Sequence, residues 1–197
     1  MGQTFVRIAG SLSLAAALAF PAVAATADWQ IDPAHSAAQF AVKHLAISTV
    51  RGAFTKVQGT VQFDSQDLTK SSVDVTIDAA SVDTREPNRD KDLRSDHFFD
   101  VEKFPTITFK SRKVEQVSPG KLKITGDLTI HGTTKEVVLD VDGPSAPIKD
   151  PWGNQRMGVN ASTKINRKDF GIGGNYPAAV IGEDIAITID SEMIQKK

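Results

Sequence analysis

The feature that most constrains this chain is the alternation of apolar with polar or small residues at every second position, from Trp29 onward. Val73, Val75 and Ile77, for example, alternate with Asp74 and Thr76. Successive side chains of a β-strand point to opposite faces, so this pattern predicts strands with one apolar and one polar face. It recurs in about eight segments, over residues 40–44, 57–63, 73–77, 107–109, 122–130, 137–141, 159–165 and 185–189. Antiparallel pairing is favoured, because strands of parallel sheets are covered on both faces and read as continuous apolar runs.

Turn signals and a short helical segment complete the expected fold. Ser118-Pro119-Gly120 and residues 131–134 are short enough to join neighbouring antiparallel strands as hairpins. Pro87–Arg94 predicts a short helix, with proline in its first turn and acidic residues near its start. Amphipathic strands in this number expose long edges unless the sheet closes. We therefore predict an all-β fold, an eight-stranded antiparallel lipocalin-like barrel with a short helical insertion between its middle strands.

The first residues read as a secretory signal peptide. Arg7 precedes the apolar run Ile8–Phe20, and Ala22-Val23-Ala24 forms a small-residue cleavage site. The run is too short to span a bilayer of about 30 Å. We predict a signal peptide over residues 1–24 and a barrel domain over 25–197, with cleavage after Ala27 as the alternative. The expected location is the periplasm.

Composition and missing motifs exclude several function classes. The sequence has no cysteine, which excludes thiol chemistry and iron–sulfur clusters. Its formal net charge of −1 gives no basic surface of the kind that nucleic acid requires. It contains no G-x-S-x-G, phosphate-binding glycine loop or H-E-x-x-H motif. His35, His97 and His131 lack the spacing of metal ligands. We therefore expect no catalytic residue, cofactor or metal, and no enzymatic activity.

Several motifs in a fixed order carry a resemblance to a known family. They are residues 40–44 (FAVKH), 50–54 (VRGAF), 82–84 (VDT) followed by Arg89-Asp90, 98–105 (FFDVEKFP), 126–135 (GDLTIHGTTK) and 166–172 (NRKDFGI). In these motifs the chain resembles the YceI family of exported lipocalin-like proteins, over nearly all of its length after the signal peptide. The resemblance implies an eight-stranded barrel with a helical insertion, a long isoprenoid or similar lipid held inside it, and a homodimer.

The candidate ligand-binding residues lie on the apolar strand faces and around the helical insertion. They are Phe40, Val42, His44, Phe54, Val75, Ile77, Leu93, Phe98, Phe99, Phe109, Leu128, Ile130 and Leu139. The alternative is that these side chains pack a solid core. Asp83, Arg89 and Arg167 are candidates for head-group contact or for a structural role. For Asp83 and Arg89 we favour an ion pair that fixes the insertion, and for Arg167 an ion pair that stabilises a turn.

The function that this resemblance implies, together with the apolar strand faces, is binding of a polyisoprenoid, of the quinone or polyprenyl type, or of a similar long-chain amphiphile, for storage or transport in the periplasm. Burying hydrocarbon gains about 0.8 kcal/mol per CH₂, which favours long chains over small ligands. Transient contact with a membrane or with a donor or acceptor protein follows from such a role. Two alternatives stay open: an enzyme acting on a quinone or isoprenoid in the same cavity, and a solid-core interaction module.

Overall fold

The computed structural model describes residues 26–196, so the predicted signal peptide lies outside the described residues. The strands are β1 (Ala27–Ile31), β2 (Ala37–His44), β3 (Ser48–Phe54), β4 (Val57–Phe63), β5 (Ser72–Asp78), β6 (Val82–Asp83), β7 (Thr106–Ser118), β8 (Lys121–Ile130), β9 (Thr133–Asp142), β10 (Ile148–Lys149), β11 (Gln155–Asn166) and β12 (Ile181–Gln195). The helix α1 spans Pro87–Arg94, and 3₁₀ turns η1 to η4 span Pro33–His35, Leu68–Lys70, Ala79–Ser81 and Arg167–Phe170. Within residues 26–196, no helix has the length and hydropathy needed to cross a bilayer.

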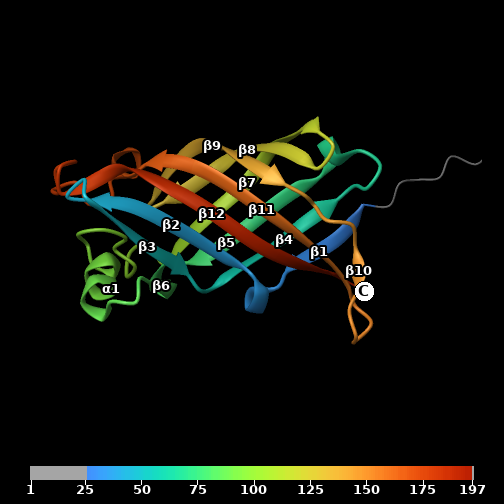
Figure 1. The fold of residues 1–197 in the computed structure, drawn as a ribbon, viewed down its shortest axis with the longest axis horizontal. Helices are drawn as coiled ribbons and strands as arrows, with labels where there is room; N and C mark the ends of the chain where they lie inside the picture. The colour runs from blue at the N-terminus through green and yellow to red at the C-terminus, as the bar shows by residue number, and fades with distance from the viewer. Residues whose placement is uncertain (1–25, 197) are drawn as a thin grey trace, which may run out of the picture.

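The sheet closes into an antiparallel barrel, as predicted. Its strand order runs β11-β9-β8-β7-β5-β4-β1-β12, and pairing of β11 with β12 closes the ring. The β11–β12 pairing extends from Arg156 opposite Ile194 to Asn166 opposite Asp184. Figure 1 shows the long strands β11 and β12 crossing the front of an elongated molecule. Closure removes the exposed strand edges that an open sheet of this size would have.

Two strands of the barrel are broken in the middle, which the sequence pattern did not reveal. β1 and β2 pair in succession with the same strand, β12, and η1 separates them. In the same way β3 pairs with β2, and β4 with β1. The strand expected at residues 40–44 is β2, which pairs with β12 but lies outside the closed ring. In the ring, the place between β4 and β12 is taken by β1.

The predicted helix is observed with the expected bounds. Glu86 caps its start, because the side-chain carboxylate accepts hydrogen bonds from the amides of Asn88 and Arg89. Arg94 fastens the helix to the barrel by donating from Nε and Nη2 to the carbonyl oxygens of Ala80 and Val82, at 2.7 and 2.6 Å. Figure 1 shows α1 next to β3 and β6, at one end of the barrel.

A cluster of charged side chains, the Arg156 cluster, holds the opposite part of the barrel together. Arg156 donates from Nη1 to Asp32 and from Nε to Asp150, each at 2.7 Å, and Nη1 also donates to Glu192. These residues come from β11, the end of β1, the loop after β10, and β12. His35 approaches Asp32 and Glu192 closely enough for the three to share a metal ion. The cation beside both carboxylates is, however, the guanidinium of Arg156, so the cluster functions as an ion-pair network.

Candidate ligand-binding cavity

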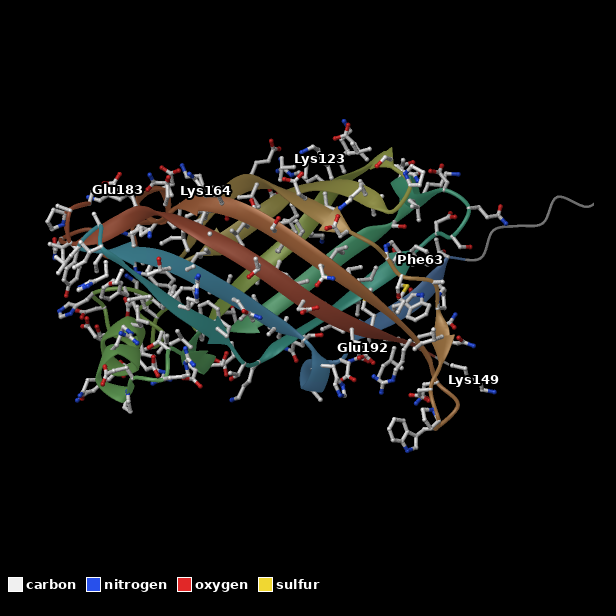
Figure 2. The ribbon with its side chains drawn as sticks, viewed as in Figure 1. Phe63, Lys123, Lys149, Lys164, Glu183 and Glu192 are labelled. Atoms are coloured by element: carbon white, nitrogen blue, oxygen red, sulfur yellow. The ribbon has the colours of Figure 1, made fainter. Side chains whose placement is uncertain are left out.

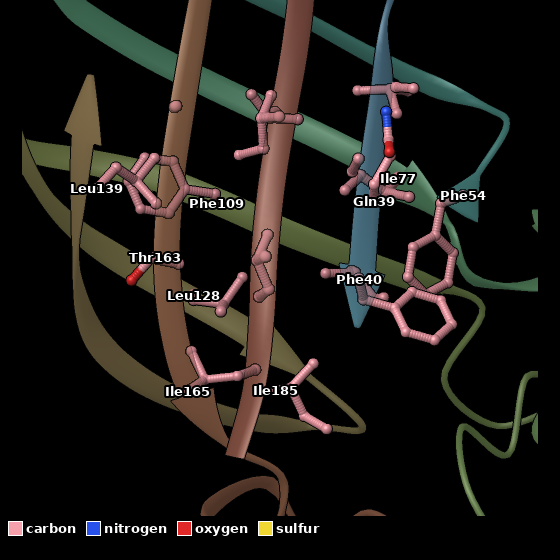
Figure 3. Close-up of a pocket in the computed structure, with 18 of the residues that line it drawn as sticks. Gln39, Phe40, Phe54, Ile77, Phe109, Leu128, Leu139, Thr163, Ile165 and Ile185 are labelled. Carbon is pink, nitrogen blue, oxygen red and sulfur yellow. The ribbon is translucent and has the colours of Figure 1, made fainter. Parts of the chain in front are cut away.

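An elongated cavity of about 610 Å³ occupies the inside of the barrel. Its wall consists of the inward-facing side chains of the barrel strands, together with residues of α1 and of the segment that follows it. Figure 3 shows Phe109, Leu128, Leu139, Ile165 and Ile185 projecting into the space between the strands. The cavity has the volume of a small-molecule pocket and a predominantly apolar lining.

The apolar side chains of the wall do not fill the interior. Ile185, Ile187 and Ile189 of β12 face inward, yet each keeps part of its surface accessible. Val73 and Val75 of β5 do the same. In a close-packed core such side chains would be almost fully buried. The solid-core alternative therefore does not describe this barrel.

The structure places every predicted ligand-binding residue in this wall, the apolar ones and His44 alike. The wall contains Phe40, Val42, His44, Phe54, Val75, Ile77, Leu93, Phe98, Phe99, Phe109, Leu128, Ile130 and Leu139. Strand alternation brings them together, because each strand candidate has the parity that points inward. A glycine makes room for one of the phenylalanine rings. A Cβ on Gly126 of β8 would lie 2.5 Å from the ring of Phe109 on β7.

An aromatic cluster forms part of the wall at the α1 end. The rings of Phe40 and Phe54 lie 5.9 Å apart, and Phe99 meets Phe54 edge-on at 5.4 Å (Figure 3 shows the first pair). Phe98 stacks on Tyr176 at 5.2 Å. These aromatic pairs both line the cavity and pack the insertion against the barrel. They join β2 and β3 to the segment that follows α1.

The cavity reaches solvent at this same end. Lys43, His44 and Asn88 are exposed on the surface and also line the cavity. Arg89 and Asp92 of α1 stand beside them, half-buried. The predicted inward orientation of His44 thus places it at the polar mouth. The charged groups of the lining gather at this opening, whereas the interior is mostly hydrocarbon with a few hydroxyl and amide groups.

The expected ion pair between Asp83 and Arg89 is wrong. Arg89 donates from Nε to the hydroxyl of Thr84 and from Nη2 to its carbonyl oxygen. The carboxylate that fixes the insertion is Asp90, which is buried and accepts from the amide of Thr84 at 2.8 Å and from its hydroxyl at 2.5 Å. Asp83 is exposed and accepts from the amide of Arg85, outside the cavity wall. Arg85 has a left-handed backbone, with φ of 61°, which turns the chain so that Asp90 meets Thr84.

Arg167 also differs from the expectation, because carbonyl oxygens and not a carboxylate surround it. Its guanidinium is buried in the cavity wall and donates to the carbonyls of Gly182, Ile172, Gly173, Tyr176 and Ile181. All its donors are thereby used within the protein. Burial lowers the pKa of Arg167 from its ordinary value. The residue holds the glycine-rich loop against the start of β12, and so shapes the mouth of the cavity.

Sequence reasoning missed part of the wall although the signal was present. Ile185, Ile187 and Ile189 show the same alternation as the chosen candidates, as do Val159 and Ile165. Tyr176 and Ile172, in contrast, come from an irregular loop, where no periodicity indicates which side chains face inward.

Comparisons with a family model, with related sequences and with solved structures agree with one another. Residues 29–193 match the family model described as a YceI-like domain. A UPF0312 protein of Vibrio cholerae is 41% identical over 164 residues, which cover 82% of this chain and 86% of the relative. The crystal structure of the Campylobacter jejuni YCEI protein has 35% sequence identity and a TM-score of 0.71, and covers 79% of this chain and 90% of the other. A polyisoprenoid-binding domain from Saccharophagus degradans, 17% identical, shares the fold with a TM-score of 0.61, over 87% of this chain and all of that domain.

Proposed function

The chain belongs to the YceI family, and we propose that it binds a polyisoprenoid, of the quinone or polyprenyl type, or a similar long-chain amphiphile, which it stores or carries in the periplasm. The observation that carries this proposal is the apolar cavity of about 610 Å³ inside the barrel. The S. degradans domain of the same fold, described as polyisoprenoid-binding, supports it.

The two ends of the cavity suit the two parts of an amphiphile. Hydrocarbon gains about 0.8 kcal/mol for each CH₂ that leaves water, so an apolar lining favours a long chain. Lys43, His44 and Arg89 at the mouth offer hydrogen-bond donors to a polar head group. A chain inside and a head at the opening satisfy both environments.

Location, assembly and absence of catalysis are part of the same proposal. Export by the signal peptide predicted for residues 1–24 takes the protein to the periplasm, where a carrier would shield a lipid from water. We expect a homodimer, which sedimentation at several protein concentrations tests. We also propose that the bound molecule leaves unchanged. Incubation with a quinone, followed by chromatography of the extract, would contradict this if a new product accumulated.

A charge placed in the cavity tests the site directly. Val75 faces the cavity, and its neighbour Thr76 on β5 has the opposite parity. We expect Val75→Glu to abolish binding of the isoprenoid alcohol farnesol, because a carboxylate in an apolar cavity opposes the chain. Thr76→Glu, the matched control, leaves binding unchanged. Titration of both variants, with circular dichroism to confirm folding, decides the matter. Normal binding by a folded Val75→Glu variant would contradict the proposed site.

A further inference from the structure

Two exposed loops meet at the open end of the cavity. One is the turn between β2 and β3, and the other is the segment that leads into β12. The amide of Leu45 donates to the carbonyl oxygen of Val180 at 2.9 Å, which joins the two loops. Figure 1 shows both at the same end of the molecule, above α1. Lys43 and His44, which line the mouth, directly precede this turn.

The turn between β2 and β3 presents apolar side chains to solvent. We call Leu45, Ala46 and Ile47 the apolar tip. Leu45 is 48% exposed and Ile47 is 83% exposed. The exposed residues Pro177–Ala179 of the second loop add further apolar surface. Exposed turns usually carry polar residues, so this composition needs a reason.

The backbone of the apolar tip makes the composition more unusual. Leu45 and Ala46 have φ angles of 51° and 60°, in the left-handed region. Hairpin turns with this geometry strongly prefer Asn-Gly or Asp-Gly, because other residues are strained there. Strained positions of this kind gather at functional sites. The chain thus holds two aliphatic residues where the turn itself favours asparagine and glycine.

We propose that the apolar tip inserts into the interfacial layer of a lipid bilayer, so that an amphiphile passes between the membrane and the cavity mouth. This inference rests on the proposed function, because it names the partner from which the cavity takes its ligand. The position of the apolar tip beside the mouth shortens the path that hydrocarbon must travel through water. Such a path is costly for a long chain.

The size and charge of the surface favour a bilayer over a protein partner. Stable protein interfaces bury about 800 Å² on each side, far more than a few side chains of a turn provide. Insertion into a bilayer needs no complementary shape. Two nearby lysines are paired, Lys164 with Asp184 at 2.6 Å and Lys168 with Glu183 at 3.7 Å, whereas Lys43, just before the apolar tip, forms no ion pair among residues 26–196. This single lysine beside three apolar side chains makes the contact mainly apolar, so we expect insertion into neutral lipid.

The chain offers a matched control surface at its other end. Trp152 and Ile148, 78% and 65% exposed, lie on the hairpin of β10 and β11. Figure 2 shows the neighbouring Lys149 at the end of the molecule opposite Glu183. This hairpin has comparable apolar exposure without proximity to the mouth. A variant of this hairpin therefore distinguishes insertion by the apolar tip from non-specific adsorption of any exposed apolar surface to vesicles.

Flotation with phosphatidylcholine vesicles tests the proposal on the exported protein. The tip variant carries Leu45→Asn, Ala46→Gly and Ile47→Ser, and the control variant carries Ile148→Ser and Trp152→Ser. Asn-Gly suits the turn, so we expect the tip variant to fold at least as stably as the parent. We expect its vesicle partitioning to fall about tenfold or more, because its inserted aliphatic surface is gone. The control variant should partition like the parent.

A fluorescent variant supplies an independent readout. Ile47→Trp should show a blue-shifted emission with vesicles, and quenching by brominated phosphatidylcholine, after subtraction of the parent signal. Equal flotation of the parent and the tip variant would overturn the proposal, as would a parent that does not float. A tip variant that floats normally but sediments as a smaller species would also overturn it and identify a protein contact.

Binding of farnesol in vesicle-free buffer separates this proposal from the proposed function. A parent that binds farnesol but not vesicles overturns membrane contact and leaves the proposed function standing. A parent that floats through the apolar tip but binds no farnesol contradicts the proposed function and supports the membrane contact.

Discussion

Single residues decide how the barrel is held together, and Arg156 is the strongest case. It connects Asp32, Asp150 and Glu192, and its side chain is only 15% exposed. The hydrogen bonds from Arg156 and then His35 hold the pKa of Asp32 at about 2, below its ordinary value of 3.8. A carboxyl group whose pKa is depressed by folding stabilises the protein above its unfolded pKa.

This shift predicts an acid-sensitive stability. Asp32 contributes its full stabilisation above the unfolded value of 3.8, and that contribution disappears as the pH falls toward the folded value of about 2. We expect the free energy of unfolding to drop over this range, as measured by urea titration at each pH. Asp32→Asn should flatten that part of the profile. An unchanged slope in Asp32→Asn would contradict the assigned role.

Arg156→Met is the harsher change at the same site. It leaves the carboxylates of Asp32 and Asp150 close together without their cation. Removing one partner of a buried charge network costs about 3 kcal/mol or more. We expect a loss of that size in urea unfolding at neutral pH, and a smaller loss at pH 3, where the carboxylates begin to protonate. An equal loss of unfolding free energy at both pH values would contradict the claim that the unpaired carboxylates cause it.

Among the elements, the helical insertion depends on one buried carboxylate. Asp90 satisfies the amide and hydroxyl of Thr84, while Asp83, which the sequence suggested, accepts one hydrogen bond near the surface. Asp90→Ala should cost about 2 kcal/mol, because it leaves two buried donors unsatisfied. Asp83→Ala, the matched control, should cost less than about 1 kcal/mol. Hydrogen exchange should accelerate in α1 of Asp90→Ala and not in β8. Equal effects of the two variants would contradict this account.

The sequence pattern predicts helices and strands well where hydrophobic periodicity is strong. It predicts them poorly where a short strand or a single turn determines the structure. Alternation found β5 and β8, and the proline at position 87 marked the start of α1. It missed β1 as a member of the ring, because a five-residue strand gives little pattern. The partner of Arg89 depended on the left-handed turn at Arg85, which no periodicity reveals.

For the whole molecule, alternation shows which side chains face the inside of the barrel, but not whether those side chains fill it. Val75 and Leu128 would carry the same pattern in a solid barrel. The presence of a cavity depends on the cross-section that strand number and stagger produce, and these are properties of the closed sheet. Alternation therefore predicts the apolar wall, whereas the space of about 610 Å³ between its side chains was expected only from the family resemblance.

The cavity volume predicts a dependence on chain length. A carbon of a hydrocarbon chain needs roughly the volume of one water molecule, about 30 Å³, so the cavity holds roughly 20 carbons. We expect affinity to rise steeply from geraniol through farnesol to geranylgeraniol, since each CH₂ contributes up to about 0.8 kcal/mol. Longer prenyl alcohols should gain little more. Affinity that is the same for geraniol and geranylgeraniol would contradict binding of the chain inside the barrel.

Native mass spectrometry of the protein purified from the exported fraction, with organic extraction of the same sample, tests the central claim most directly. We predict a mass above that of the mature chain, by the mass of one isoprenoid or other long-chain amphiphile per barrel, and recovery of that molecule in the extract. The mass of the bare chain, unchanged after incubation with quinones and polyprenyl phosphates, would contradict the claim that the cavity binds such a lipid.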